Sequence, residues 1–351
     1  MSTQIAGIAD AEQSAGHWTT ARARARRTRR RHAFVVCLLL AATGVAGLAT
    51  LCLSRDMPFG TAVQTLRGHG TRGTEYILYT LRAPRLLCAA AVGTALGASG
   101  AVFQTLLRNP LAGPDLMGLT TGSSFGAVAA ITLFQAALPG IAFGAVLGGL
   151  VAAAAVYGLS FRRGVSGHRI VVVGIAVNAI ATTGVNYLLT RASVQQAQPA
   201  QLWLIGNLNG AGWTQCAFTT AALAILLPAA CLLRRALGAL ELGDDKARSL
   251  GTRVESARLT ALALGVGLAA SATAVAGPVA FVALAAPQLA RRLARTGTPP
   301  LLGAGAMGAL LVVTSDWAAQ WALSTPLPVG IVTAALGGGY LGWTLLVAKA
   351  R

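Results

Sequence analysis

Residues 86–107 read Leu-Leu-Cys-Ala-Ala-Ala-Val-Gly-Thr-Ala-Leu-Gly-Ala-Ser-Gly-Ala-Val-Phe-Gln-Thr-Leu-Leu, an apolar run without a charge between Arg85 and Arg108. A helix needs about 20 such residues to cross a lipid bilayer. The run therefore predicts a transmembrane helix. Further charge-free runs of this kind lie between Arg169 and Arg191 and between Arg295 and Asp316.

The composition agrees with a chain that crosses the membrane many times. Of its 351 residues, 55% are hydrophobic and 11% are charged, and the mean hydropathy is +0.64. The charge-free run 192–233 begins with a polar and aromatic stretch that favours an interfacial, re-entrant piece before a span from about Thr214. Longer charge-free runs are divided by helix breakers at Pro139-Gly140, at Gly277-Pro278 and around Pro326 and Pro328. We expect an all-α, polytopic membrane protein with about ten transmembrane helices.

Basic residues predict the orientation of these helices. Residues 1–32 form a basic extension, expected to be disordered, with seven arginines between Arg22 and Arg31. Under the positive-inside rule this end is cytoplasmic, and an even number of spans puts the C-terminus there too. Residues 33–351 then form one transmembrane domain in the cell (inner, cytoplasmic) membrane. On this map the only basic residues outside are Arg55, Arg67, Arg72, Arg82, Arg85 and Arg191.

The spans themselves are rich in small residues and poor in charge. Alanine and glycine dominate residues 89–101 and 144–155, which favours close helix packing, with the lining of a wide pathway as the alternative. Asp115 and Asp316 are the candidates for charge in the membrane zone, each near a predicted helix end. All four histidines lie outside the spans, so we expect no buried proton relay.

Several function classes are excluded. The net charge of +18 flanks apolar spans instead of forming a soluble basic face, which argues against nucleic-acid binding. The chain has no phosphate-binding loop, no zinc-protease motif and no Ser/His/Asp set that can be placed together. Its five cysteines lack metal-ligand spacing. We therefore expect no enzyme activity, no cofactor and no resident metal.

One segment concentrates charge of both signs. Residues 241–258 read Glu-Leu-Gly-Asp-Asp-Lys-Ala-Arg-Ser-Leu-Gly-Thr-Arg-Val-Glu-Ser-Ala-Arg and hold four of the ten acidic residues. Gly243 and Gly251 bracket a predicted short helix whose first turn is acidic and whose last turn is basic, as the helix dipole favours. The predicted orientation makes the loop at about 235–258 cytoplasmic. We expect it to touch a soluble partner, with a solvated loop without a partner as the alternative.

Two further blocks accompany this charged segment. Non-helical backbone at membrane depth is tolerated only where protein or a water-filled cavity satisfies it, so their proline breaks indicate a structured interior. The first block contains Arg82-Ala-Pro-Arg85, Gly97-Ala-Ser-Gly-Ala-Val-Phe-Gln104, Arg108-Asn-Pro-Leu-Ala-Gly-Pro114 and Met117-Gly-Leu-Thr-Thr-Gly122. The second is Gly277-Pro-Val-Ala-Phe-Val-Ala-Leu-Ala-Ala-Pro-Gln288 with Arg291.

In this order and spacing, the three blocks resemble the FecCD-type permeases of ATP-binding-cassette (ABC) importers, which carry iron siderophores, haem or cobalamin. The likeness covers roughly residues 34–351. It implies a type II importer permease of ten transmembrane helices, paired around a central path with a second permease subunit, either the same chain or a paralogue. It also implies two copies of a cytoplasmic ATP-binding subunit, an extracytoplasmic substrate-binding protein and, on family breadth, a metal-siderophore cargo.

The resemblance assigns roles to two groups of residues, and the helix breaks predict a third group. Arg82 and Arg85 match outer-face arginines that pair with carboxylates of the binding protein, with anchoring at lipid headgroups as the alternative. The ATPase-coupling group comprises Leu242, Gly243, Asp244, Asp245, Ala247, Arg248, Leu250 and Gly251. The group at the translocation pathway and helix breaks comprises Gln104, Asn109, Pro110, Pro114, Gly277, Pro278 and Pro287.

Some positions depart from the family pattern. Gln288 stands where the family usually has histidine, Gln320 where some relatives have arginine, and Gly338-Gly-Tyr-Leu341 replaces the usual ending. These departures bear on the cargo and on contacts with the binding protein. Two rival functions stay open: an ion-coupled secondary transporter with discontinuous helices near Asn109 and Gly277, and an export permease of related architecture.

Overall fold

The computed structural model describes residues 27–28, 30–52, 58–160, 167–296, 300–322 and 325–349, and every regular element in these ranges is a helix. Most of the basic extension 1–32 lies outside the described residues. In chain order the helices are the N-terminal span Arg30–Cys52, α2 Phe59–Leu66, α3 Arg72–Glu75, η1 Tyr76–Arg82, α4 Ala83–Leu107, η2 Asp115–Met117, α5 Leu119–Phe134, α6 Leu138–Ser160, α7 Gly167–Arg191, α8 Val194–Leu204, α9 Trp213–Leu232, α10 Arg234–Glu241, α11 Asp244–Ser249, α12 Val254–Ala276, α13 Val282–Ala294, α14 Leu301–Trp321 and α15 Val329–Lys349.

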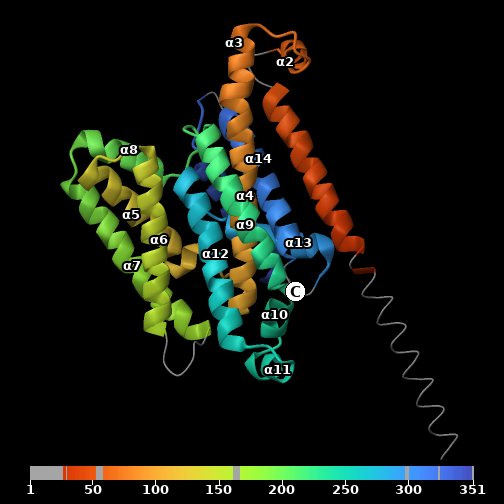
Figure 1. Cartoon of the computed structure of the whole chain (residues 1–351), viewed down its shortest axis with the longest axis vertical. Coiled ribbons are helices and arrows are strands. Elements are labelled where there is room, and N and C mark those ends of the chain that lie inside the picture. Colours follow the sequence, from red (N-terminus) through yellow and green to blue (C-terminus); the bar gives the residue numbers. More distant parts are fainter. Residues whose placement is uncertain are drawn as a thin grey trace, which may run out of the picture.

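The helices confirm a multi-pass, all-α membrane protein. Within the described ranges, seven are long and apolar enough to cross a bilayer: the N-terminal span, the continuous helix Arg72–Leu107, α6, α7, α9, α12 and α14. Two shorter apolar helices, α5 and the first part of α15, and the short α13 complete the bundle. The polar stretch after Arg191 forms α8, which lies across one end of α5, α6 and α7 (Figure 1).

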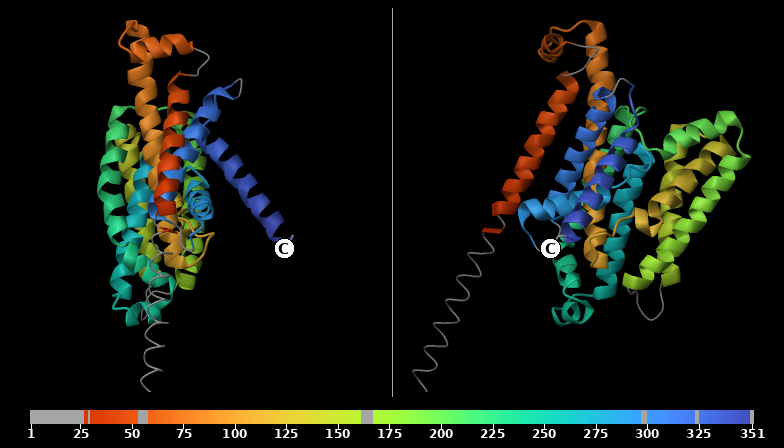
Figure 2. Two further views of the ribbon diagram at one scale, coloured as in Figure 1. Left: turned by 90° about the vertical axis from the view of Figure 1, so that its right-hand side faces the viewer. Right: turned by 180° about the vertical axis from the view of Figure 1, so that it is seen from behind.

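Both described ends of the chain lie at one end of the molecule. The N-terminal span begins, and α15 finishes, at the end that carries α10 and α11, whereas α2 and α3 project from the opposite end (Figure 1 and Figure 2). We call these the α11 end and the α3 end. This arrangement agrees with an even number of crossings.

Pro84 shapes the longest helix near the α3 end. Tyr76–Arg82 is wound as a π-helix, and α4 starts at Ala83 with Pro84 in its first turn. Proline has no N–H to donate to the preceding turn, and a stretch of wider π-helix accommodates this missing bond. Arg82 and Arg85 therefore lie on either side of a junction in the helix.

Helix α4 forms the centre of the bundle. It packs against α9, α12, α13 and α14, and its Val92 and Leu96 share a buried cluster with Leu268 of α12 and Val312 of α14. A second cluster, nearer the α11 end, includes Phe103 of α4, along with residues of α10, α11 and α12. Buried apolar contacts of α4 thus occur both at its middle and near the charged segment.

The small residues of the spans serve close helix packing. A Cβ at Gly93 of α4 would lie 2.3 Å from the carbonyl oxygen of Gly308 on α14, and one at Gly148 of α6 would lie 2.2 Å from that of Gly122 on α5. These distances leave no room for a side chain. Of the two explanations for the small residues, dense packing therefore holds at both interfaces.

Gly148→Val is expected to destabilise the α5–α6 pair by about 3 kcal/mol. The new side chain would clash with the backbone at Gly122, which could move only together with the rest of α5. Gly158→Val on the same helix is the matched control, since a Cβ there meets nothing within 4 Å. Thermal unfolding of the detergent-solubilised protein measures both. Equal stability of the two variants would show that the α5–α6 contact is not tight.

Candidate functional site

The charged segment folds into two short helices joined by a glycine turn. Helix α10 ends at Glu241, and α11 spans Asp244–Ser249 between Gly243 and Gly251, where the sequence predicts a short helix. Gly243 and Gly251 adopt φ values of 104° and 80°, which favour glycine over any other residue. Ala247 is fully buried, whereas the side chains of Leu242 and Leu250 are exposed at the α11 end.

Asp244 anchors α11 to two membrane helices. Its Oδ1 accepts hydrogen bonds from Arg108 at the end of α4 and from Arg258 of α12, both at 3.0 Å, and its Oδ2 accepts a second bond from Arg258. The Arg258 side chain is only 5% exposed, and it also lies 3.5 Å from the Glu255 carboxylate. A buried guanidinium thus donates two hydrogen bonds to this carboxylate, and loss of either partner from such a pair is costly. We call Asp244, Arg108 and Arg258 the Asp244 clamp.

Asp245, the next residue, has a different environment. Its side chain is fully exposed, and its ion pair is with Arg248, one turn later on the same helix, at 3.1 Å. Such exposed pairs contribute little to stability. The charged segment therefore has an inner side, fixed by the Asp244 clamp, and an outer side with Leu242, Asp245, Arg248 and Leu250.

At the α3 end, Arg85 binds a buried carboxylate. Its Nε and Nη2 donate to Asp316 of α14 at 2.8–3.2 Å, and Nη1 donates to Asn209 at 2.9 Å. Asp316 is 2% exposed in its side chain and accepts a further bond from Gln320 at 2.7 Å. Asp316, the predicted intramembrane acid at this end, is thus neutralised by Arg85, one of the two predicted docking arginines.

Arg82 is also engaged within the chain. Its Nη1 donates to the carbonyl oxygen of Leu51 in the N-terminal span at 3.0 Å, and its guanidinium lies 5.5 Å from the ring centre of Trp321. Both arginines hold neighbouring helices together at the α3 end. Their pairing with a binding protein stays a prediction.

The predicted break at Gly277-Pro278 lies close to two other parts of the chain, the turn after α8 and the start of α15. Helix α12 ends at Ala276, whose carbonyl oxygen accepts from the backbone N–H of Asn207 at 2.8 Å. A Cβ at Gly277 would lie 2.4 Å from the carbonyl oxygen of Trp203. Gly330, at the start of α15, donates to the Gly206 carbonyl at 3.0 Å. The non-helical backbone is therefore buried in protein, as the membrane interior requires.

The other predicted break residues join α4 to α13. Gln104 is buried and donates to the carbonyl oxygen of Leu284 at 3.0 Å, and Gln288 donates to that of Pro110 at 2.8 Å. Asn109 accepts from the backbone N–H of Leu111 in a local turn. Pro114 and Pro287 are buried. Gln104, Pro114 and Pro287 thus lie in packed interior, and a place on a pathway stays a prediction for this group.

Helix α7 carries a polar face that the sequence analysis did not single out. Thr183, Asn186 and Thr190 are exposed and lie three to four residues apart, on one face of the helix. The threonine hydroxyls bond carbonyls of the preceding turn, but within the described residues the Asn186 side chain makes no hydrogen bond. An unpaired amide facing lipid is costly. This spacing was readable from the sequence.

Metal ligands are sparse in the described part of the chain. There, no group of three or more histidine, cysteine or acidic side chains could hold an ion, and the five cysteines are free. The arrangement can hold helices in place and present surfaces at both ends of a membrane bundle.

Comparison with known proteins places this architecture in a family. The model of the FecCD transport family matches residues 34–347. The chain belongs to this family. It is 39% identical to the ferric enterobactin transport system permease protein of Escherichia coli (strain K12), with 92% of this chain and 98% of that protein covered. It is 32% identical to the iron(3+)-hydroxamate import system permease protein of Bacillus subtilis (strain 168), with 90% and 94% covered.

A solved structure extends the comparison to the fold. An inward-facing metal-chelate type ABC transporter superposes with a TM-score of 0.78 at 26% identity, with 90% of this chain and 98% of that chain covered. These FecCD relatives are permease subunits of transporters and not enzymes. The family and the type II importer permease architecture expected from the sequence are confirmed.

Proposed function

We propose that the chain is the permease subunit of an ABC importer that moves a ferric siderophore, or a similar metal chelate, into the cytoplasm. The observation that carries the proposal is the 39% identity to a ferric enterobactin permease over 98% of that protein. Other relatives are named for hemin and cobalamin, which are also metal complexes of large organic ligands. The cargo therefore belongs to this chemical class.

The partners follow from the two ends of the bundle. Two ATP-binding subunits dock at the α11 end, which is cytoplasmic together with both termini and the basic extension 1–32. A substrate-binding protein docks at the α3 end, outside the cell membrane, through Arg82 and Arg85. A second permease subunit, a copy or a paralogue, completes the path.

The charged segment is the proposed contact with the ATP-binding subunit. Its outer side offers two exposed leucines beside an exposed ion pair, a surface that suits a groove with both apolar and polar walls. Its inner side is tied by the Asp244 clamp to α4 and α12. A displacement of α11 by the ATP-binding subunit would thus reach two membrane helices directly.

The polar face of α7 is the proposed lining of the path. Exposed side chains of α9 such as Phe218, Ile225 and Leu232 are apolar and suit lipid, whereas the exposed Asn186 of α7 suits water or a polar cargo. Asn186→Trp is expected to lower transport at least tenfold by narrowing the path, without loss of folded protein. Ile225→Trp on α9 is the control and should transport normally. Normal transport by Asn186→Trp would remove α7 from the path.

Reconstitution tests the function as a whole. The chain is placed in proteoliposomes with its ATP-binding subunit and binding protein, and uptake of a ⁵⁵Fe-siderophore is followed with and without ATP. Uptake that requires ATP and the binding protein is the expected result. Uptake by the chain alone under an ion gradient would instead establish the secondary transporter, and ATP-driven transport indifferent to the binding protein would favour an exporter.

A further inference from the structure

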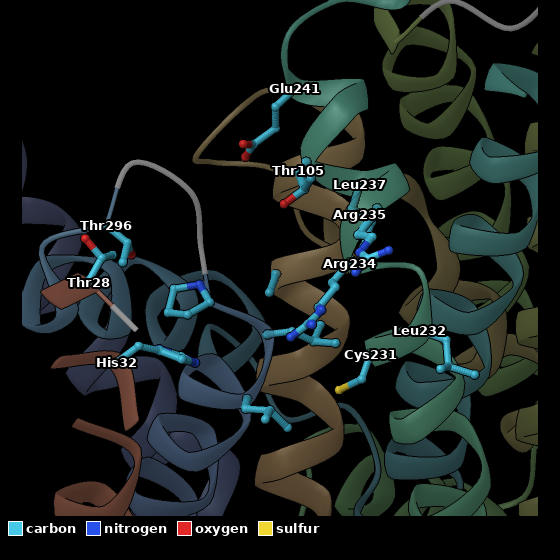
Figure 3. Close-up of a pocket in the computed structure, with 15 residues that line it drawn as sticks. Thr28, His32, Thr105, Cys231, Leu232, Arg234, Arg235, Leu237, Glu241 and Thr296 are labelled. Carbon is cyan, nitrogen blue, oxygen red and sulfur yellow. The ribbon is translucent and has the colours of Figure 1, made fainter. Parts of the chain in front are cut away.

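A cleft of about 990 Å³ opens near the α11 end of the bundle (Figure 3). It lies between the start of the N-terminal span, α4, the junction of α9 with α10, and the start of α14. Its volume is in the range of roughly 300–1,000 Å³ that small-molecule sites occupy. Its walls combine leucines with two arginines, namely Leu232, Leu237, Leu301, Leu302, Arg234 and Arg235.

The cleft lies between helices that face lipid. Leu232, in its wall, is 85% exposed, and the N-terminal span exposes Phe34 and Leu38. The opposite face of that span packs on α13 and α14, where Val35 and Leu39 are buried against Ala290. A space between lipid-facing helices, lined by leucine, is filled by hydrocarbon in a bilayer, since water there would leave apolar surface exposed.

The cleft carries positive charge where it meets the start of α10. Arg234 and Arg235 begin α10 and are exposed, and within the described residues neither forms an ion pair or a side-chain hydrogen bond. In Figure 3 the Arg234 side chain extends toward the space between α10 and His32 of the N-terminal span. Glu241 is the one carboxylate among the lining residues. It lies at the opposite end of α10 from Arg234 and interacts electrostatically with Arg291.

We propose that this cleft binds one anionic phospholipid of the membrane leaflet at the α11 end. The phosphate lies at Arg234, with Arg235 at the rim, and an acyl chain lies along Leu232, Leu301 and Leu302. Guanidinium groups bind phosphate oxygens through paired N–H donors, and basic pockets between transmembrane helices on the cytoplasmic side favour anionic headgroups. The bound lipid would stabilise the first turn of α10. This helix leads through Gly243 into α11.

Native mass spectrometry of the full chain in detergent tests the site. The protein is titrated with palmitoyl-oleoyl-phosphatidylglycerol and, separately, with the phosphatidylcholine of the same chains. One phosphatidylglycerol molecule should be retained at least about fivefold more tightly than phosphatidylcholine, the difference that one arginine near a membrane surface typically makes. Arg234→Gln should remove this preference. Inorganic phosphate at millimolar concentration should not displace the lipid, because it lacks the acyl chain.

Two further variants keep the test decisive. Arg253→Gln removes an exposed arginine of the same end that does not line the cleft, and it should keep the preference. Gly238→Phe fills open space in the cleft and leaves both arginines in place, so it should weaken the binding of both lipids. Equal retention of the two lipids by the unmodified chain, or equal losses in Arg234→Gln and Arg253→Gln, would overturn the proposal. Displacement by free phosphate would also overturn it.

Discussion

Asp244→Ala is expected to lower ATP-driven transport by about 30-fold. A local free-energy cost of about 2 kcal/mol lowers by this factor the population of molecules in which α11 is held against α4 and α12. The cost arises because Arg258, which is 5% exposed, would lose both of its hydrogen bonds to Asp244. Removal of one partner from a fully buried pair costs about 3–5 kcal/mol, and the partial exposure of Asp244 reduces this figure. Helix α11 would then lose its side-chain hydrogen bonds to Arg108 and Arg258, while its outer side stays unchanged.

Asp245→Ala is the matched control, one residue away on the same helix. Its fully exposed ion pair with Arg248 is expected to contribute little to stability. Reconstituted complexes measure both variants by ATP hydrolysis and by ⁵⁵Fe-siderophore uptake. In Asp244→Ala, hydrolysis should persist while uptake falls. If Asp245→Ala lost uptake as strongly as Asp244→Ala, the outer face and not the clamp would control coupling.

The sequence predicts the features of this fold that the bilayer itself dictates. Charge-free runs such as 86–107 must be helical in lipid, and Gly277-Pro278 must end a helix, because neither residue type continues one well. The short helix after Gly243 was also predictable, since its charges follow the helix dipole. These inferences need only local sequence and the properties of the membrane.

The partners of individual charges could not be predicted in this way. Asp244 meets Arg108, which lies 136 positions away in the chain, and Arg85 meets Asp316 over a separation of 231. Only the packing of α4 against α12 and α14 brings these groups together. Asp244 and Asp245 are therefore alike in the sequence, whereas Asp244 binds two arginines of other helices and Asp245 is fully exposed. The polar face of α7, in contrast, follows a helical period and was open to detection.

Asp316→Leu is expected to destabilise the folded chain by about 3–5 kcal/mol, because Arg85 would lose its bidentate partner in a largely buried position. Arg85→Leu should cost a similar amount, since Asp316, 2% exposed, would keep only its bond from Gln320 among side chains of the described residues. Thermal unfolding in detergent measures both. A loss below about 1 kcal/mol in either variant would show that the pair is not structurally important.

The double variant Arg85→Leu/Asp316→Leu separates the two roles that Arg85 now has. Replacement of a buried ion pair by apolar residues of similar size is often neutral for stability, so this chain should fold with nearly the original unfolding temperature. It nevertheless lacks the guanidinium that is predicted to meet the binding protein. Weaker binding of that protein to a stably folded double variant would establish the docking role of Arg85. Unchanged binding would assign Arg85 to helix packing alone and leave Arg82 as the docking arginine.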